Sequence, residues 1–188
     1  VTGAITRPAV FKTNASGLEL PLTLDPAGSV FVVFREPMAT RHVVTVSQPE
    51  AEIGFAADAT LVARLWKSGP HSLEYSDGSI TNVSAEALPS PLEIVGPWTV
   101  QFPAGLGAPP SVVFEKLESW TSRPEEGVRH FSGTAKYARE FEIPADRLGQ
   151  GRELWLELGD VQVIAEVLVN GQDLGILWKP PFRLNSTA

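Results

Sequence analysis

Apolar and polar side chains alternate along two of three strand-like stretches in the second half of the chain. Alternation with a period of two residues is typical of β-strands that have one face in solvent. The first two stretches cover residues 136–143 and 153–158. The third, residues 161–169, is largely apolar, with Val163, Ala165, Val167 and Val169 on one face and Ile164, Glu166 and Leu168 on the other. Asn170 and Gly171 follow the third stretch directly, and both residue types tolerate the positive φ of a two-residue type I′ turn. The pattern therefore predicts three strands, the last of which leads into a β-hairpin.

The first half of the chain holds shorter runs of the same kind. Residues 30–34, Val-Phe-Val-Val-Phe, are apolar without interruption, which predicts a central strand covered on both faces. Asp77-Gly78 predicts a hairpin turn between two further strands. No stretch repeats apolar residues every 3.6 positions over about 11 residues, so helix is expected only as single turns. The predicted class is therefore all-β. The remaining strand candidates of this half are residues 18–24, 42–46, 60–66, 71–75 and 79–83.

A linker is predicted near the middle of the chain. A chain of 188 residues can form one large β domain or two of about 90 residues each. The run A-L-P-S-P within residues 85–91 carries two prolines and little that could be buried, as linkers do. We therefore expect a small β-rich, sandwich-like domain over residues 1–90 and a β-sandwich over residues 91–188.

The second half also carries a family resemblance. Its motifs are F-S-G-T-A-x-Y-x-x-x-F-x-I-P from Phe131, L-x-L-G-D-V from Leu156, and A-E-V-L-V-N-G-x-x-L-G-x-L-W-K-x-P-F from Ala165. This succession resembles the jelly-roll "sugar-binding" domain of glycoside hydrolase family 2. It resembles still more the equivalent domain near the C-terminus of family 106 α-L-rhamnosidases. The resemblance implies a galactose-binding-like β-sandwich that is an accessory part of a larger carbohydrate-active enzyme.

Two details of the resemblance bear on the ends of that domain. In the first half, L-x-L-D-P-x-G-S-V-F-V-V-F-R from Leu22 resembles the strand pair that precedes the jelly roll in the family 106 relatives. Those relatives continue after P-F-x with further strands, whereas this chain ends at Ala188. We therefore expect a truncated jelly roll, which either has an open sheet edge near Phe182 or closes differently from its relatives.

Composition excludes several classes of protein and partner. The hydrophobic share of 43% and the charged share of 20% are those of a folded chain. The net charge of −7 is spread over both halves, so no basic face and no nucleic-acid partner are predicted. No apolar run approaches the ~20 residues that span a bilayer, so no membrane partner is predicted. The resemblance implies a bacterial periplasmic or secreted protein, whose partners are a polysaccharide or oligosaccharide and the catalytic domain of the parent enzyme.

Carboxylates are the first candidates for chemistry, since a glycosidase needs two of them beside the sugar. Glu140 and Glu142 share a strand face about 6–7 Å apart, although such a face is usually solvated. Glu166 interrupts the apolar run 161–169, and we expect it to form an ion pair with Arg139 or Lys179. A compact glycoside hydrolase that uses these carboxylates stays open as an alternative.

Metal and cofactor sites find little support in the sequence. Cysteine is absent, which excludes disulfides and thiolate metal sites. His42, His71 and His130 lack the spacing of a zinc site. No cofactor is therefore predicted. A structural calcium ion in a loop such as residues 171–173 stays open, because jelly rolls often hold one.

Aromatic side chains are the candidates for carbohydrate binding. Sugars stack their apolar C–H faces on indole rings, while charged side chains take their hydroxyls. Trp120 in S-W-T and Trp178 in L-W-K-P-P occupy loop-like positions, and Arg129 and Lys179 lie close to them in sequence. We therefore predict a sugar site that includes Trp120 or Trp178 with Arg129 or Lys179. Trp98 is expected in the core.

The leading hypothesis is an accessory carbohydrate-binding or structural module of a bacterial, α-L-rhamnosidase-like glycoside hydrolase. It rests on the motifs of residues 131–182 and on the lack of a convincing catalytic constellation. The alternatives are the compact glycoside hydrolase described above and a protein-protein assembly module.

Overall fold

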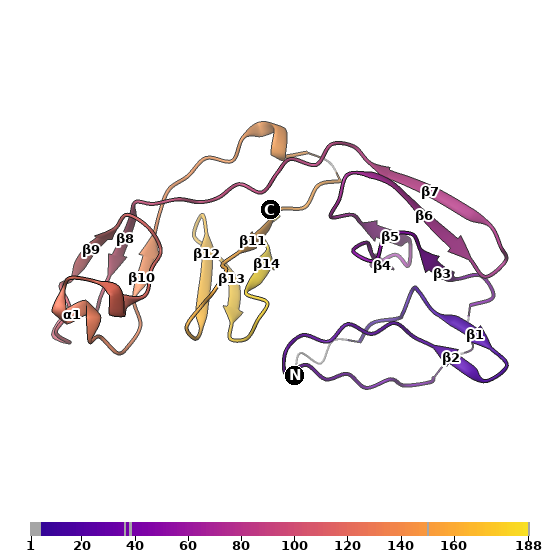
Figure 1. Cartoon of the computed structure of the whole chain (residues 1–188), viewed down its shortest axis with the longest axis horizontal. Coiled ribbons are helices and arrows are strands. Elements are labelled where there is room, and N and C mark those ends of the chain that lie inside the picture. The colour runs from indigo at the N-terminus through magenta and orange to yellow at the C-terminus, as the bar shows by residue number, and fades with distance from the viewer. Residues whose placement is uncertain (1–4, 36, 38, 150, 188) are drawn as a thin grey trace. The chain divides into compact units, whose positions relative to one another are not determined.

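The computed structural model describes residues 5–35, 37, 39–149 and 151–187 (Figure 1). Its described residues form short strands of three to seven residues and three helices of a single turn. Every pairing between these strands is antiparallel. The all-β class is therefore confirmed, as is the expectation of helix only as single turns.

The chain divides into two compact units. Unit 1 combines residues 1–89 with residues 153–188, and unit 2 is formed by residues 90–152. The first change of unit falls within the stretch that the sequence predicts as a linker. The predicted division into domains 1–90 and 91–188 remains a prediction.

Unit 1 contains a three-stranded sheet with a small core. Its strands are β3 (Val43–Val46), β6 (Gly69–Tyr75) and β7 (Ile80–Ala85), in the order β3-β6-β7. Alternate residues of β6 point inward, so Leu73 and Tyr75 pack with Val43 while their neighbours face outward. The predicted turn at Asp77-Gly78 joins β6 to β7. Gly78 has a φ of 79°, and the Ser79 N–H donates to the Asp77 carboxylate.

The described residues of unit 1 also form four two-stranded sheets. The hairpin of β12 and β13 contains the predicted type I′ turn, with φ values of 52° at Asn170 and 80° at Gly171. The pairs β4-β5 and β11-β14 supply the candidate site described below. The strands of these sheets are β1 (Lys12–Asn14), β2 (Gly17–Glu19), β4 (Glu52–Phe55), β5 (Leu61–Arg64), β11 (Trp155–Glu157), β12 (Ala165–Val169), β13 (Gln172–Leu177) and β14 (Arg183–Asn185).

Unit 2 has its own hydrophobic core. Its sheet has the order β10-β8-β9, and Val100, Phe114 and Val128 are completely buried beneath it. Trp98 packs against this core, as expected. The elements of unit 2 are β8 (Trp98–Gln101), β9 (Ser111–Phe114), β10 (Lys136–Ala138), η1 (Trp120–Ser122), α1 (Glu126–Arg129) and η2 (Ala145–Arg147).

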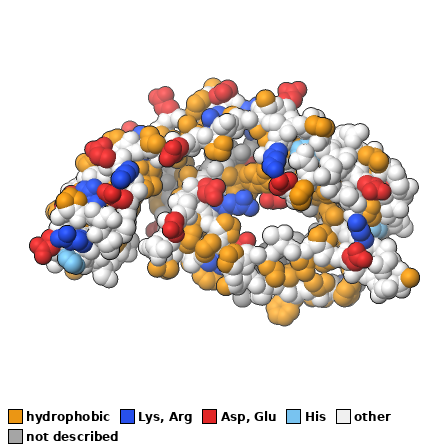
Figure 2. Space-filling model, in the orientation of Figure 1, with side chains coloured by type: hydrophobic (Ala, Val, Ile, Leu, Met, Phe, Trp, Pro, Cys, Tyr) orange, Lys and Arg blue, Asp and Glu red, His pale blue; other side chains and the backbone are white. Residues whose placement is uncertain are grey.

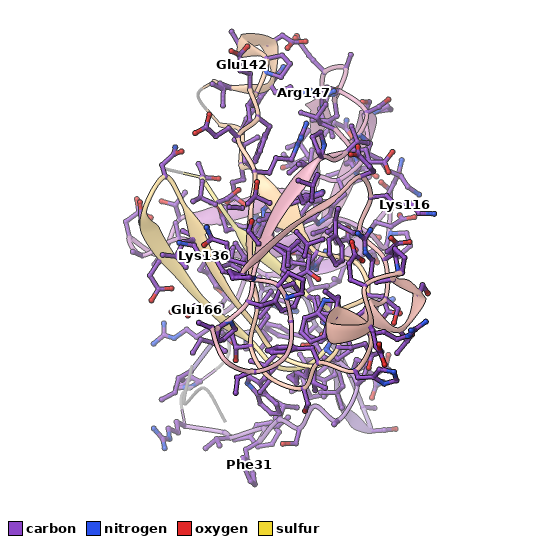
Figure 3. All side chains as sticks on the ribbon, turned by 90° about the vertical axis from the view of Figure 1, so that its left-hand side faces the viewer. Phe31, Lys116, Lys136, Glu142, Arg147 and Glu166 are labelled. Carbon is purple, nitrogen blue, oxygen red and sulfur yellow. The ribbon has the colours of Figure 1, made fainter. Side chains whose placement is uncertain are left out.

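The prediction for residues 30–34 is wrong for this chain. The described residues of this run belong to no strand, and all five side chains are exposed. Figure 3 shows Phe31 projecting away from the ribbon. An apolar run shows which side chains favour burial, but no sheet of the described chain packs against these five side chains. The predicted strand 136–143 is also shortened to β10, since residues 139–143 form no ladder in the structure.

The protein exposes more surface than compact bodies of its mass. Its accessible area is 14076 Å², whereas two separate compact bodies that shared the mass would expose roughly 10,600 Å². Hydrophobic side chains reach the surface at many places on the face that Figure 2 shows. Part of this apolar surface lies on residues that the sequence predicts to be buried, such as Val30 and Phe34.

Candidate functional site

Six side chains of unit 1 meet where the pair β4-β5 approaches the pair β11-β14. We call them the tryptophan-arginine cluster. Antiparallel pairing sets Glu52 of β4 opposite Arg64 of β5, and Trp66 follows Arg64 by two residues. Glu153 lies two residues before Trp155, which is the first residue of β11. The members of the cluster are Glu52, Arg64, Trp66, Glu153, Trp155 and Arg183.

Arg64 joins the two sheets. Its Nε and Nη2 atoms donate to the two carboxylate oxygens of Glu153 at 2.7 and 3.1 Å, and its Nη1 donates to Glu52 at 2.8 Å. Such a fork on a carboxylate is the strongest geometry available to an arginine. The indole N–H groups add to it, since Trp66 donates to Glu52 at 3.1 Å and Trp155 donates to Glu153 at 2.9 Å. Both carboxylates are therefore held by several donors.

These hydrogen bonds shift the pKa values of Arg64 and Glu153. The hydrogen bonds to Glu153 and then to Glu52 raise the pKa of Arg64. The hydrogen bonds from Arg64 and then from Trp155 lower the pKa of Glu153. A general acid of a glycosidase needs a raised pKa so that it keeps its proton near neutral pH. Glu153 is therefore unsuited to that role.

The aromatic rings and Arg183 form the more open part of the cluster. The rings of Trp66 and Trp155 are half-buried and meet edge to face at 5.6 Å between centroids. The guanidinium of Arg183 lies 5.3 Å from the Trp66 ring and 5.5 Å from the Trp155 ring. Among the described residues its ion-pair partner is Glu52, at a long distance of 3.6 Å, and 40% of the Arg183 side chain is exposed. Arg183 therefore retains donors that a ligand can reach beside two indoles.

The sequence predicts only part of this cluster. Glu153 and Trp155 share the wet face of the alternating run 153–158, which places an aromatic ring where solvent was expected. Arg64 lies 89 residues away from Glu153 in sequence. No local pattern predicts that contact, because it depends on how β5 and β11 come together.

Trp178 and Lys179 of the predicted sugar site lie at the end of β13 in unit 1. Trp178 is 61% exposed, so its ring is available to a ligand. Lys179 is half-buried, and its Nζ donates to the carboxylate of Asp25 at 3.0 Å. The lysine therefore already has an acidic partner, and the sugar site at these two residues stays a prediction.

Trp120 and Arg129 of the predicted site lie in unit 2. Trp120 is half-buried, its indole N–H donates to the hydroxyl of Tyr137, and its ring meets Phe102 at 5.7 Å and Phe131 at 5.5 Å. Burial is the main cause that raises the pKa of Tyr137. Arg129 is exposed at the end of α1. Trp120 is therefore bound into the core of unit 2, while Arg129 faces solvent.

The carboxylates that the sequence offered for catalysis are all exposed. Glu140 and Glu142 lie after β10, and Glu166 lies on β12 opposite Ile176 (Figure 3). The expected ion pair of Glu166 is not formed. Lys179 binds Asp25 instead, and Arg139 donates to the carbonyl of Pro97 at 2.8 Å. Glu166 faces solvent because the outer face of the β12-β13 hairpin is uncovered.

The described residues contain no group of three or more histidine or acidic side chains that could hold a metal ion. In the loop that the sequence left open for calcium, Asp173 accepts the N–H of Gly175 at 2.8 Å. Among the same described residues, no helix has the length and apolar character needed to cross a bilayer.

Comparison with known proteins finds a relative in sequence. No protein-family model matches the chain. Over 120 residues, 63% of its length, the chain is 40% identical to a protein of Formosa agariphila named "Putative beta-glucuronidase", of which the match covers 10%. The chain thus spans about a tenth of this relative. The match supports a domain associated with glycoside hydrolases, in line with the motif resemblance.

One solved structure shows a weak likeness. The rhamnosidase of Novosphingobium sp. PP1Y aligns with 78% of this chain and with 19% of its own, at 25% identity and a TM-score of 0.46. At this TM-score the likeness carries no argument about the site. The assignment to family 106 and the jelly-roll topology remain predictions.

Glu153 makes the stability of unit 1 depend on pH. Because its pKa in the folded state lies below the ordinary value of 4.5, its contribution is complete above about pH 5 and is lost as the pH falls through the folded-state pKa. We expect the urea midpoint of unit 1, followed by tryptophan fluorescence, to fall between about pH 6 and about pH 3.

The variant Arg64→Met tests the source of this dependence. Because the partners are partly exposed, the free energy of unfolding should fall by about 1 kcal/mol at neutral pH. The further loss in acid should become smaller, since Glu153 then has no cation to lower its pKa. Lys12→Met, at an exposed cation of β1, is the control and should change neither quantity. An unchanged acid dependence in Arg64→Met would contradict the assignment.

Proposed function

We propose that this chain is a non-catalytic β module of a larger glycoside hydrolase and that it binds carbohydrate through the tryptophan-arginine cluster. The observation that carries the proposal is the half-buried pair of indoles beside the exposed guanidinium of Arg183. Indole rings offer an apolar surface for sugar C–H groups, and an arginine offers several donors in a fixed plane. The similarity to a tenth of a glycoside-hydrolase-type protein supports the context.

The proposed ligand is an oligosaccharide that contains a uronic acid. Arg64 is occupied by two carboxylates, whereas Arg183 has one long contact and can pair with a sugar carboxylate. The name of the Formosa relative points to the same class of sugar. We further propose that the module is a truncated galactose-binding-like jelly roll related to family 106. Its parent enzyme is then a bacterial periplasmic or secreted protein.

Calorimetric titration with glucuronic-acid-containing oligosaccharides tests the proposal. Trp155→Ala should weaken binding about tenfold, because a stacked aromatic ring contributes about 1 kcal/mol or more. Arg183→Ala should weaken binding of the acidic sugar more than binding of its neutral, carboxyl-reduced counterpart. Thermal melting of each variant checks that the fold is retained.

Trp178→Ala is the matched control, since it removes an exposed indole outside the cluster. Binding that is lost in Trp178→Ala and kept in Trp155→Ala would move the site to Trp178 and Lys179. A chain that binds no sugar and forms a dimer or larger species would support the alternative of an assembly module.

Turnover assays with aryl glycosides address the alternative of a compact glycoside hydrolase. The candidates from the sequence, Glu140 and Glu166, are exposed, and Glu153 of the cluster has a lowered pKa. We therefore expect no turnover by the purified chain. Turnover that is abolished by Glu140→Gln, Glu166→Gln or Glu153→Gln would overturn the non-catalytic assignment.

A further inference from the structure

The five apolar residues 30–34 form an exposed segment outside the strands of the described chain. Phe31 and Val33 point to one side of an extended chain, and Val30, Val32 and Phe34 to the other. Their exposed fractions are 51% for Val30, 90% for Phe31, 47% for Val32, 61% for Val33 and 79% for Phe34. Neither face is therefore covered.

The edges of this segment are open as well. Residues 20–35 contribute to none of the strand pairings of the described chain. The run contains no charge, no proline and no glycine, which are the features that protect natural strand edges against unwanted pairing. A segment with two apolar faces and two free edges has the properties of a central strand that lacks its sheet.

The start of the segment is fixed to unit 1. Asp25 to Gly28 form a tight turn in which the Gly28 N–H donates to the Asp25 carbonyl at 2.7 Å. The Asp25 carboxylate accepts a hydrogen bond from Lys179, at the end of β13, at 3.0 Å. This contact links the turn before residue 30 to a hairpin more than 150 residues later. The turn that precedes residues 30–34 is therefore joined to the end of β13 by an ion pair.

The pattern of exposure identifies the kind of partner. A second copy of this chain could pair with one edge of the segment, but edge pairing covers neither apolar face. Both faces and both edges are covered together only when a strand lies inside a sheet that has layers above and below it. The chain spans about a tenth of its Formosa relative, so a longer polypeptide of that type has ample material for such layers.

We propose that residues 30–34 form a central strand of a β-sheet whose neighbouring strands and covering layers come from the rest of the parent glycoside hydrolase. The proposal rests on the proposed function in so far as it requires a longer parent polypeptide. Its effect is to anchor the module by β-strand addition, in which backbone hydrogen bonds hold the segment and pockets receive alternate side chains.

Cysteine labelling tests this directly, because the chain has no cysteine of its own. Phe31→Cys and Val32→Cys report the two faces. Lys116→Cys, at a side chain that is 79% exposed in unit 2, is the control. Each variant is made in the 188-residue chain and in the full polypeptide of its reading frame, and alkylation at each site is followed by peptide mass spectrometry.

All three sites should react rapidly in the 188-residue chain. In the full polypeptide, the cysteines at positions 31 and 32 should react at least tenfold more slowly, while that at position 116 stays reactive. Hydrogen exchange of residues 31–34 in the unsubstituted proteins gives the same comparison without a substitution that could disturb folding.

Fast alkylation at either position in the full polypeptide would overturn the proposal, since one face would then be open. A reading frame that encodes only this chain would also overturn it. Protection that rises with the concentration of the 188-residue chain would identify a second copy as the partner instead. Loss of sugar binding in Trp155→Ala leaves these labelling rates unchanged, so the two proposals fail separately.

Discussion

Replacing Phe114 with alanine is expected to unfold most of unit 2. Phe114 is completely buried in β9, its ring meets Tyr137 edge to face at 5.9 Å, and the guanidinium of Arg123 lies 4.2 Å from its centroid. Loss of a buried phenylalanine side chain costs about 3–5 kcal/mol. A unit of about 60 residues has a total stability of roughly 3–9 kcal/mol. The substitution therefore removes most or all of the stability of this unit.

Hydrogen exchange of the amides of β8 and β9 measures the effect in the whole chain. Their protection should fall to the level of an open segment in Phe114→Ala. Val113→Ala is the matched control, because Val113 is the preceding residue of β9, points to the opposite face and is 53% exposed. Its protection should change little. Equal losses in the two variants would show that the buried ring does not hold the unit together.

Local chemistry allowed the turns and several strands to be predicted from the sequence. The Asn170-Gly171 and Asp77-Gly78 turns occur where expected, since each depends on the φ values that two adjacent residues can adopt. Strand β12 likewise follows from alternation along a few residues. Such features are encoded within about ten residues of sequence, so no distant contact is needed to predict them.

Contacts between distant segments could not be predicted. The position of Trp120 next to a turn suggested exposure, but its ring packs against Phe102 and Phe131. The tryptophan-arginine cluster depends on a contact between residues 64 and 153. The uninterrupted apolar run 30–34 predicted a covered central strand, but the run alone could not say whether this chain supplies the cover. In each case the missing information is which surfaces meet, and this is a property of the tertiary structure.

The two units also differ in what their charged groups do. In unit 2, Arg123 donates to Glu118 and Glu125 and lies over the ring of Phe114, so this cation serves the core. In unit 1, Arg64 likewise donates to two carboxylates, those of Glu52 and Glu153. Arg183, by contrast, retains exposed donors beside two indoles. This difference is the reason that the proposed binding site lies in unit 1.

Replacing Gly127 with alanine is expected to destabilise unit 2 by about 3 kcal/mol, the upper end of the cost of overpacking. A Cβ atom at this position of α1 would lie 2.1 Å from the carbonyl oxygen of Gly107 and 3.0 Å from the Cα of Ala108. Both contacts are with backbone atoms, which cannot turn away as a side chain can. The loop before β9 must therefore move away from α1, and this opens the core around the buried Val128.

Chemical unfolding of the whole chain measures the loss, and Glu126→Ala, at an exposed neighbour on the same helix, is the control that should change stability by less than about 0.5 kcal/mol. A stability of Gly127→Ala equal to that of the control would contradict the close approach of the two backbones.

The same variant distinguishes between the candidate sugar sites of the two units. Gly127 lies two residues before Arg129 and in the unit that contains Trp120, so a site in unit 2 would lose affinity together with stability. Binding through the tryptophan-arginine cluster of unit 1 should be retained, because none of its six members belongs to unit 2.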